Sequence, residues 1–145
     1  MTDIDSLDKR GRTALMNACR FSDANTAEIL IDAGADVHVI DRIGMTALMY
    51  ACNTGSAANI KRLIDANANV NIINCNGCTA LMMAACATTT ATVRLLLKAG
   101  ATINTVDSNN DTALTMAIVF GNGAIAKLLT NAAKYAGANI VRVRC

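Results

Sequence analysis

The chain has 145 residues, of which 53% are hydrophobic and only 3% aromatic, and its formal net charge at pH 7 is +2. This length fits one ordinary domain, whose core must be built from Ala, Leu, Ile, Met and Val because aromatic residues are scarce. No apolar run approaches the roughly 18 residues of a membrane-spanning helix, and the first residues, 1–5, are acidic rather than typical of a signal peptide. We therefore expect a soluble protein of the cytoplasm or the nucleus.

One short motif returns along the chain at a constant step. The sequence Thr-Ala-Leu begins at Thr13, Thr46, Thr79 and Thr112, and each step from Thr to Thr is 33 residues. A fixed period of about 20 to 50 residues is typical of a repeat array, in which each unit stacks on its neighbours. We therefore predict a single domain over residues 1–145, with units at about residues 8–40, 41–73, 74–106 and 107–140.

Each unit is predicted to begin with a tight turn. Two residues before the recurring Thr stand Gly11, Gly44 and Gly77, and Asn110 takes this place in the last unit. Gly adopts a positive φ most readily and Asn is the next best residue, so the Asn fits the same turn.

Two helices are predicted to follow each turn. The Thr is a good N-cap for a short apolar helix, and a second helix follows in which apolar residues fall three and four apart, most clearly at 59–66 and 93–99. Just beyond the second helices stand Gly34, Asn67 and Gly100, as expected for a left-handed residue past a helix C-terminus. Each unit therefore reads turn, helix, turn, helix, loop, which is an all-α architecture.

Two places depart from this pattern. The Gly that should close the last unit comes four residues late, at Gly137, and four residues make about one helical turn. We therefore predict that the last helix is extended by one turn, through Ala136, and that residues 141–145 form a tail. In the third unit Thr88 takes the place of Gly55 and Gly121. A β-branched residue is poor at positive φ, so we expect an altered turn between the two helices there.

These residues resemble the ankyrin repeats. The matching positions of the second unit are Asp41, Gly44, Thr46, Leu48, Ala51, Gly55 and Leu63. The segment 34–37, which closes the first unit, matches as well. The resemblance covers about residues 8–140. It implies an all-α solenoid of helix-turn-helix units with β-turn or hairpin fingers. It also implies a protein-binding function without enzymatic activity.

The sequence differs from the family pattern after the recurring Thr. Where the family has Pro, the chain has Ala14, Ala47, Ala80 and Ala113, and where it has His, the chain has Met16, Met49, Met82 and Thr115. Ala is a good helix former, and Met packs adaptably. We therefore expect the usual shape with a more apolar spine.

The resemblance also implies where a partner would bind. In ankyrin arrays the turn tips and the inner face of each first helix line a concave groove. Carried over by position, the partner-binding residues are Lys9, Arg10, Arg12, Arg20, Phe21, Arg42, Ile43, Met45, Asn53, Thr54, Asn76, Cys78, Asn109, Asp111 and Phe120. Five basic residues among them fall in the first two units, so we expect an acidic end of the partner there and an apolar contact near Phe120. The alternatives are an ordinary solvated surface and, for Phe21 or Phe120, a buried position.

One cysteine pair raises the question of redox or metal chemistry. Cys75 and Cys78 form a Cys-x-x-Cys motif, which can be a redox pair or half of a zinc site. A structural zinc needs four ligands, the motif occurs once, and the only histidine is His38. We therefore predict no metal, no cofactor and no catalytic residue, and interpret both as surface thiols, with a thiol-based redox switch as an alternative. Cys19 and Cys52 hold equivalent positions and are expected to be buried.

Two classes of function follow. The first is a protein-protein interaction module, an adaptor or an inhibitor, as the resemblance implies. The alternative is nucleic-acid binding through the basic N-terminal part of the groove. The net charge of only +2 and the absence of aromatic residues among the basic ones argue against nucleic acid. The apolar segment 117–119 leaves either a monomer or weak self-association through the C-terminal repeat.

Overall fold

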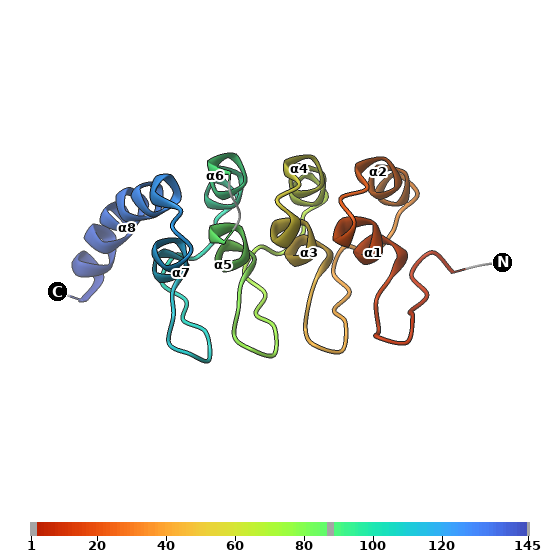
Figure 1. The fold of residues 1–145 in the computed structure, drawn as a ribbon, viewed down its shortest axis with the longest axis horizontal. Coiled ribbons are helices and arrows are strands. Elements are labelled where there is room, and N and C mark those ends of the chain that lie inside the picture. The colour runs from red at the N-terminus through yellow and green to blue at the C-terminus, as the bar shows by residue number, and fades with distance from the viewer. Residues whose placement is uncertain (1–2, 87–88, 145) are drawn as a thin grey trace.

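The helices are arranged in consecutive pairs. The computed structural model describes residues 3–86 and 89–144, and within these ranges it contains eight α-helices and no strand. The pairs are α1 (Ala14–Arg20) with α2 (Ala24–Asp32), α3 (Ala47–Thr54) with α4 (Ala57–Asp65), α5 (Ala80–Ala85) with α6 (Thr90–Lys98), and α7 (Ala113–Val119) with α8 (Gly123–Arg144). Figure 1 shows the pairs side by side in chain order. The predicted all-α solenoid is confirmed.

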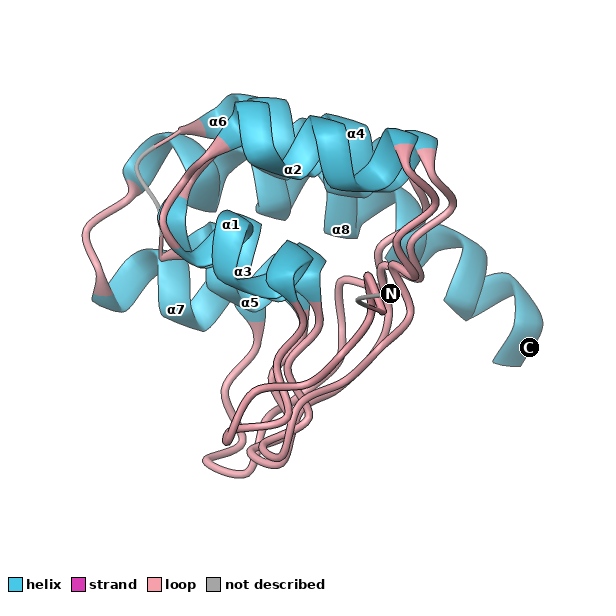
Figure 2. Ribbon diagram, turned by 90° about the vertical axis from the view of Figure 1, so that its right-hand side faces the viewer, coloured by secondary structure: helices cyan, strands magenta, loops and turns pink. Residues whose placement is uncertain are grey.

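The pairs build two helical layers and a row of loops. The first helices, α1, α3, α5 and α7, form an inner layer in which each contacts the next, and α2, α4, α6 and α8 form an outer layer in the same way. We call the loop before each inner helix a finger; the tips of fingers one to four are residues 8–12, 41–45, 74–78 and 107–111. The fingers project side by side from the inner layer, on the side away from the outer layer (Figures 1 and 2). Fingers and inner helices therefore share one face along the array, which we call the finger face.

The recurring Thr begins each inner helix, as predicted. The side-chain oxygen of each Thr accepts a hydrogen bond from the backbone N–H three residues further on, at 3.1 to 3.2 Å, in Thr13, Thr46, Thr79 and Thr112. This contact satisfies one of the N–H groups that the first turn of a helix leaves without a partner.

A single side chain braces each finger. The first residue of the tip accepts hydrogen bonds of 2.8 to 3.0 Å from the backbone N–H groups two and four positions further on; these residues are Asp8, Asp41, Asn74 and Asp107. The fourth residue of the tip has a positive φ in all four fingers: 77° at Gly11, 79° at Gly44, 76° at Gly77 and 69° at Asn110. The prediction that Asn110 replaces Gly in the same conformation is confirmed.

Neighbouring fingers are joined through their backbones. The N–H of Arg42 donates to the carbonyl of Arg10 at 3.2 Å, Cys75 to Ile43 at 3.0 Å, and Ser108 to Asn76 at 2.8 Å. The approach is close enough that a Cβ on Gly44 would lie 2.9 Å from the Cα of Asn74. The spacing of the finger tips along the array is therefore fixed by main-chain contacts.

The core lies between the two layers. Its largest fully buried side chains include Leu15, Leu48 and Leu81 of the inner helices and Ile60, Leu63, Leu96, Ile125 and Leu129 of the outer helices. Burying a side chain of this size contributes roughly 1.5–3 kcal/mol. Met16, Met49 and Met82, which stand where the family has His, are buried as predicted, and so are Cys19 and Cys52.

The last helix is longer than the sequence suggested. We expected α8 to end after Ala136, but it continues to Arg144, so residues 137–140 are helical rather than a closing loop. The segment contains no proline, and a single Gly such as Gly137 costs a helix only about 1 kcal/mol relative to Ala. The turn expected to be altered at Thr88 lies outside the described residues. Among the described residues, no helix combines the length and apolarity that a membrane crossing would need.

Candidate functional site

A hollow of about 600 Å³ opens on the finger face between the first two helix pairs. Fingers one and two, the end of α1 and the end of α3 supply its lining. The lining residues are Lys9, Arg10, Arg12, Arg20, Arg42, Ile43, Tyr50, Asn53 and Thr54. We call this site the basic hollow. All of these residues except Tyr50 were singled out from the sequence, so the structure brings together most of the predicted N-terminal site.

The basic residues of the hollow differ in whether they have an ionic partner. The Nε atom of Arg12 lies 3.1 Å from the Oδ2 atom of Asp8, so this cation is paired within finger one. Hydrogen bonds to the Asp8 carboxylate, above all from the backbone N–H of Arg12, hold the pKa of Asp8 well below its usual range. Within the described residues, no ion pair involves the other four cations, which are Lys9, Arg10, Arg20 and Arg42.

Arg20 is held by aromatic rings. Its guanidinium carbon lies over the ring of Phe21, 5.1 Å from the centroid, and over the ring of Tyr50, 5.8 Å from the centroid. A cation at such distances is attracted to the negative face of the ring. These contacts position Arg20 through the ring faces and leave its N–H donors unused by the rings.

Tyr50 is in turn positioned by a buried carboxylate. Its hydroxyl donates to Asp41, the same residue that accepts the N–H groups of Ile43 and Met45 in finger two. Burial, followed by the hydrogen bond to Asp41, raises the pKa of Tyr50 to about 12. Tyr50 therefore stays protonated at neutral pH and links helix α3 to its finger.

Sequence reasoning missed Tyr50 because the repeat offers no parallel. The equivalent positions hold Asn17, Met83 and Met116, so the position has no consistent residue type. The spacing did indicate that Tyr50 belongs to the site, since it stands three and four residues before Asn53 and Thr54. Residues at this spacing share one face of a helix.

The remaining predicted residues lie elsewhere on the array. Phe21 and Phe120 are 73% and 62% exposed, so the alternative of a buried position is wrong for both. Met45 is only 6% exposed, because it belongs to the hydrophobic core, and it is not presented to a partner. Fingers three and four carry Asn76, Cys78, Asn109 and Asp111, which are exposed or partly buried and include no basic side chain. Positive charge on the finger tips is thus confined to fingers one and two.

The side chains of Cys75 and Cys78, both in finger three, contact different neighbouring fingers. The Sγ atom of Cys75 lies 4.0 Å from the carbonyl oxygen of Arg42 in finger two, and that of Cys78 lies 3.9 Å from Oδ2 of Asp107 in finger four. Both thiols are free. Burial, followed by the nearby charge of Asp107, raises the pKa of Cys78, and a raised pKa lowers the fraction of reactive thiolate. No group of three His, Cys, Asp or Glu residues in the described part of the chain could hold a metal ion.

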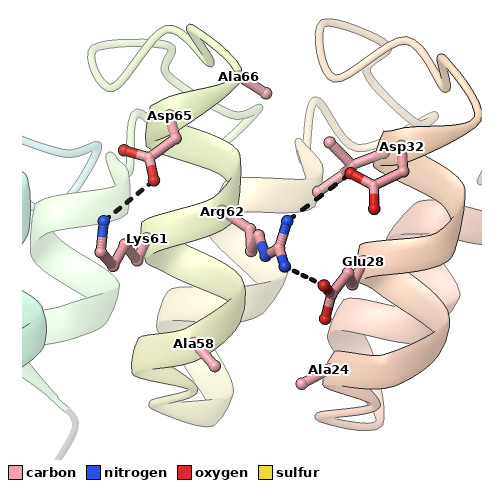
Figure 3. Close-up of a pocket in the computed structure, with 9 residues that line it drawn as sticks. Ala24, Glu28, Asp32, Ala58, Lys61, Arg62, Asp65 and Ala66 are labelled. Carbon is pink, nitrogen blue, oxygen red and sulfur yellow. Dashed lines mark hydrogen bonds and ion pairs between the residues drawn. The ribbon is translucent and has the colours of Figure 1, made fainter.

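A second hollow, of about 590 Å³, lies between the outer helices α2 and α4. Figure 3 shows Arg62 reaching from α4 toward Glu28 and Asp32 of α2, with Lys61 beside Asp65. Each of these five charged side chains belongs to an ion pair, with distances of 3.7 Å for Arg62 to Asp32 and 3.0 Å for Lys61 to Asp65. The charges of this outer hollow therefore satisfy one another and connect neighbouring units, unlike those of the basic hollow.

Comparison with known proteins agrees with this architecture. A family model described as ankyrin repeats (3 copies) matches residues 1–74 and 55–142. A search of curated proteins finds no significant match. The two matched segments overlap and together span residues 1–142, which include every finger and inner helix described above. The chain belongs to the ankyrin-repeat family.

Proposed function

We propose that the chain acts as a protein-binding adaptor or inhibitor, which holds a partner protein on its finger face. Ankyrin repeats generally mediate protein–protein interaction. Different sequences on such a scaffold bind unrelated targets, so the partner of this chain is determined by its own surface.

The observation that carries the proposal is the basic hollow. Four of its cations have no ionic partner among the described residues, and a backbone contact between fingers one and two sets the spacing of the tips that carry three of them. Its lining consists of Lys, Arg, Ile, Tyr, Asn and Thr residues. Side chains of these types, without a paired nucleophile and base, are suited to holding a ligand rather than to transforming it.

The experiment is a crosslinking pull-down from a cell extract, with the native chain compared with the variant Arg20→Glu/Phe120→Ala. A matched control is Arg94→Glu/Tyr135→Ala, which makes the same charge reversal and also removes one aromatic ring, at exposed positions of the outer helices α6 and α8. We expect a protein that the native chain and the control capture and that the finger-face variant loses. Circular dichroism of the three proteins shows that the fold is retained.

Other results would contradict the proposal. Equal capture by all three proteins would move the binding surface away from the finger face. Recovery of nucleic acid in place of a protein, with a steep dependence on salt, would favour nucleic-acid binding instead.

A further inference from the structure

The guanidinium N–H groups of Arg20 remain available to a ligand. The rings of Phe21 and Tyr50 hold its guanidinium group, and no ion pair with a described residue uses it. Guanidinium N–H groups form a rigid fork that matches a carboxylate or a phosphate through two parallel hydrogen bonds. A guanidinium that is already positioned loses less conformational entropy when it binds such a group.

The carboxylates in the tips of fingers one and two are occupied within the fold. Asp8 pairs with Arg12 and also accepts the N–H groups of finger one. Asp41 is buried and accepts two N–H groups of finger two and the hydroxyl of Tyr50. The hollow is lined by five cations, against these two carboxylates in the finger tips, so a net positive charge remains and an anionic ligand would find it concentrated in one place.

The distribution of charge favours a polypeptide over a nucleic acid. Nucleic-acid backbones need a positive track along their length and exposed aromatic rings on which bases stack. Here the basic tips stop at finger two, which leaves no positive track along fingers three and four, although the rings of Phe21 and Tyr50 do lie beside Arg20. Further along, the end of α7 exposes the apolar segment 118–120. A polypeptide, unlike a nucleic acid, can change from acidic to apolar within a short length.

We propose, building on the protein-binding function above, that the basic hollow binds an acidic segment of the partner polypeptide. Side-chain carboxylates of that segment are received by Arg20, Arg42 and the cations of finger one. The hollow, at about 600 Å³, is within the usual range of ligand sites, about 300–1,000 Å³, and so has room for several side chains. The partner then continues along the finger face toward Phe120, which fixes its direction.

The test begins with selection from a random peptide display library on the native chain. We expect the selected peptides to be rich in Asp and Glu compared with the starting library. A selected peptide and its counterpart with Gln and Asn in place of Glu and Asp are then labelled, and their affinities are measured by fluorescence anisotropy. The acidic peptide should bind better, and its affinity should fall as salt is raised.

Variants locate the site. Arg20→Gln should weaken binding of the acidic peptide by on the order of tenfold, because a hydrogen-bonded charge is lost. Arg20→Lys should recover only part of the affinity, since an ammonium group cannot bind a carboxylate through a fork. Arg94→Gln, which removes one positive charge from the exposed surface of α6, should leave the affinity unchanged. The urea midpoint of each variant is measured to show that the fold is intact.

The outcomes separate this inference from the function on which it depends. If the selected peptides were neutral or apolar and Phe120→Ala still abolished their binding, the proposal of an acidic segment would be wrong. Protein binding by the finger face would still be supported. Tighter binding when phosphoserine replaces the glutamates would assign the hollow to a phosphorylated segment instead. Failure to select any peptide, with binding of a single-stranded DNA or RNA oligomer, would overturn both proposals.

Discussion

Tyr50 and Asp41 join an inner helix to the finger that precedes it. The phenolic hydroxyl of Tyr50, on α3, donates to the carboxylate of Asp41, the first residue in the tip of finger two. The same carboxylate braces the finger through the N–H groups of Ile43 and Met45. One contact thus couples the local conformation of the finger to the ring that supports Arg20.

Replacement of Tyr50 by Phe removes this hydrogen bond and keeps the ring. We expect the free energy of unfolding, measured by urea denaturation, to fall by about 1–3 kcal/mol, because the Asp41 carboxylate loses a donor. Tyr135→Phe is the control, since Tyr135 is largely exposed and should change stability little. Equal stabilities for the two variants would show that the Tyr50 contact contributes nothing.

The raised pKa of Tyr50 predicts a loss of stability in alkaline solution. Its pKa rises from 10 in the reference state to about 12 in the folded protein. Between these values the unfolded chain has lost the phenolic proton and the folded chain keeps it, so folding becomes less favourable as pH rises. The Tyr50 contribution is therefore complete below pH 10 and is lost by about pH 12. The difference in unfolding free energy between the native chain and Tyr50→Phe, measured across this range, should shrink as pH rises; a constant difference would contradict the assignment.

Asn59 is a weak point of the core. Its side chain is fully buried on α4, and neither its Nδ2 nor its Oδ1 atom has a hydrogen-bond partner among the described residues. Burying an unsatisfied polar group costs roughly 1–3 kcal/mol. Asn59→Val, which replaces the amide with a somewhat larger apolar group, should therefore raise the free energy of unfolding by up to about that amount. Asn25→Val, at an exposed position of α2, is the control, and a stabilisation no larger than that of the control would argue that Asn59 has an unseen partner.

Substitution of two glycines by Ala distinguishes the cost of backbone strain from the cost of crowding between fingers. Gly34 and Gly44 both have positive φ, of 91° and 79°, but an added Cβ meets nothing within 4 Å at Gly34 and lies 2.9 Å from the Cα of Asn74 at Gly44. Gly34→Ala should cost about 1–2 kcal/mol from the left-handed conformation alone. Gly44→Ala should cost about 1–3 kcal/mol more, because finger three must move. Thermal unfolding of both variants gives the comparison, and equal costs would mean that the fingers can separate freely.

The cysteines should react with a thiol reagent in order of exposure. Cys75 is exposed, whereas burial raises the pKa of Cys19 to about 12 and also raises that of Cys52. We expect Cys75 to be modified first, and Cys19 and Cys52 only when the chain unfolds, as followed by mass spectrometry of the digested protein. Formation of a disulfide between Cys75 and Cys78 under mild oxidant would revive the redox switch, against the opposed directions of the two side chains.

Much of the fold could be predicted because each local sequence signal recurs in several units. A Thr that caps a helix and a Gly or Asn that turns the chain appear at the same place in successive units, so single exceptions such as Asn110 do not obscure them. The residues of the basic hollow were found in another way, because the resemblance to the ankyrin repeats implied which positions of each unit face a partner.

Features that occur once were not predictable in this way. The aromatic support of Arg20 depends on Tyr50, and the tie between α2 and α4 depends on Arg62; neither residue repeats in the other units at its position. The positive φ of Ser22, 57°, was also missed: the equivalent Gly55 and Gly121 have positive φ as well, but Ser is not a residue that marks such a turn. Met45 was placed on the surface by its position in the finger, although its apolar side chain gains more free energy from burial.

Each pair of neighbouring fingers is joined by a hydrogen bond between main-chain atoms. The side chains at the second and third positions of a tip, which neither brace the finger nor need a positive φ, can therefore be exchanged without loss of this main-chain contact. Selection for a new partner could thus act on one tip at a time, at little expense to folding. The basic side chains of fingers one and two and the neutral side chains of finger three can therefore vary independently of each other on the same backbone.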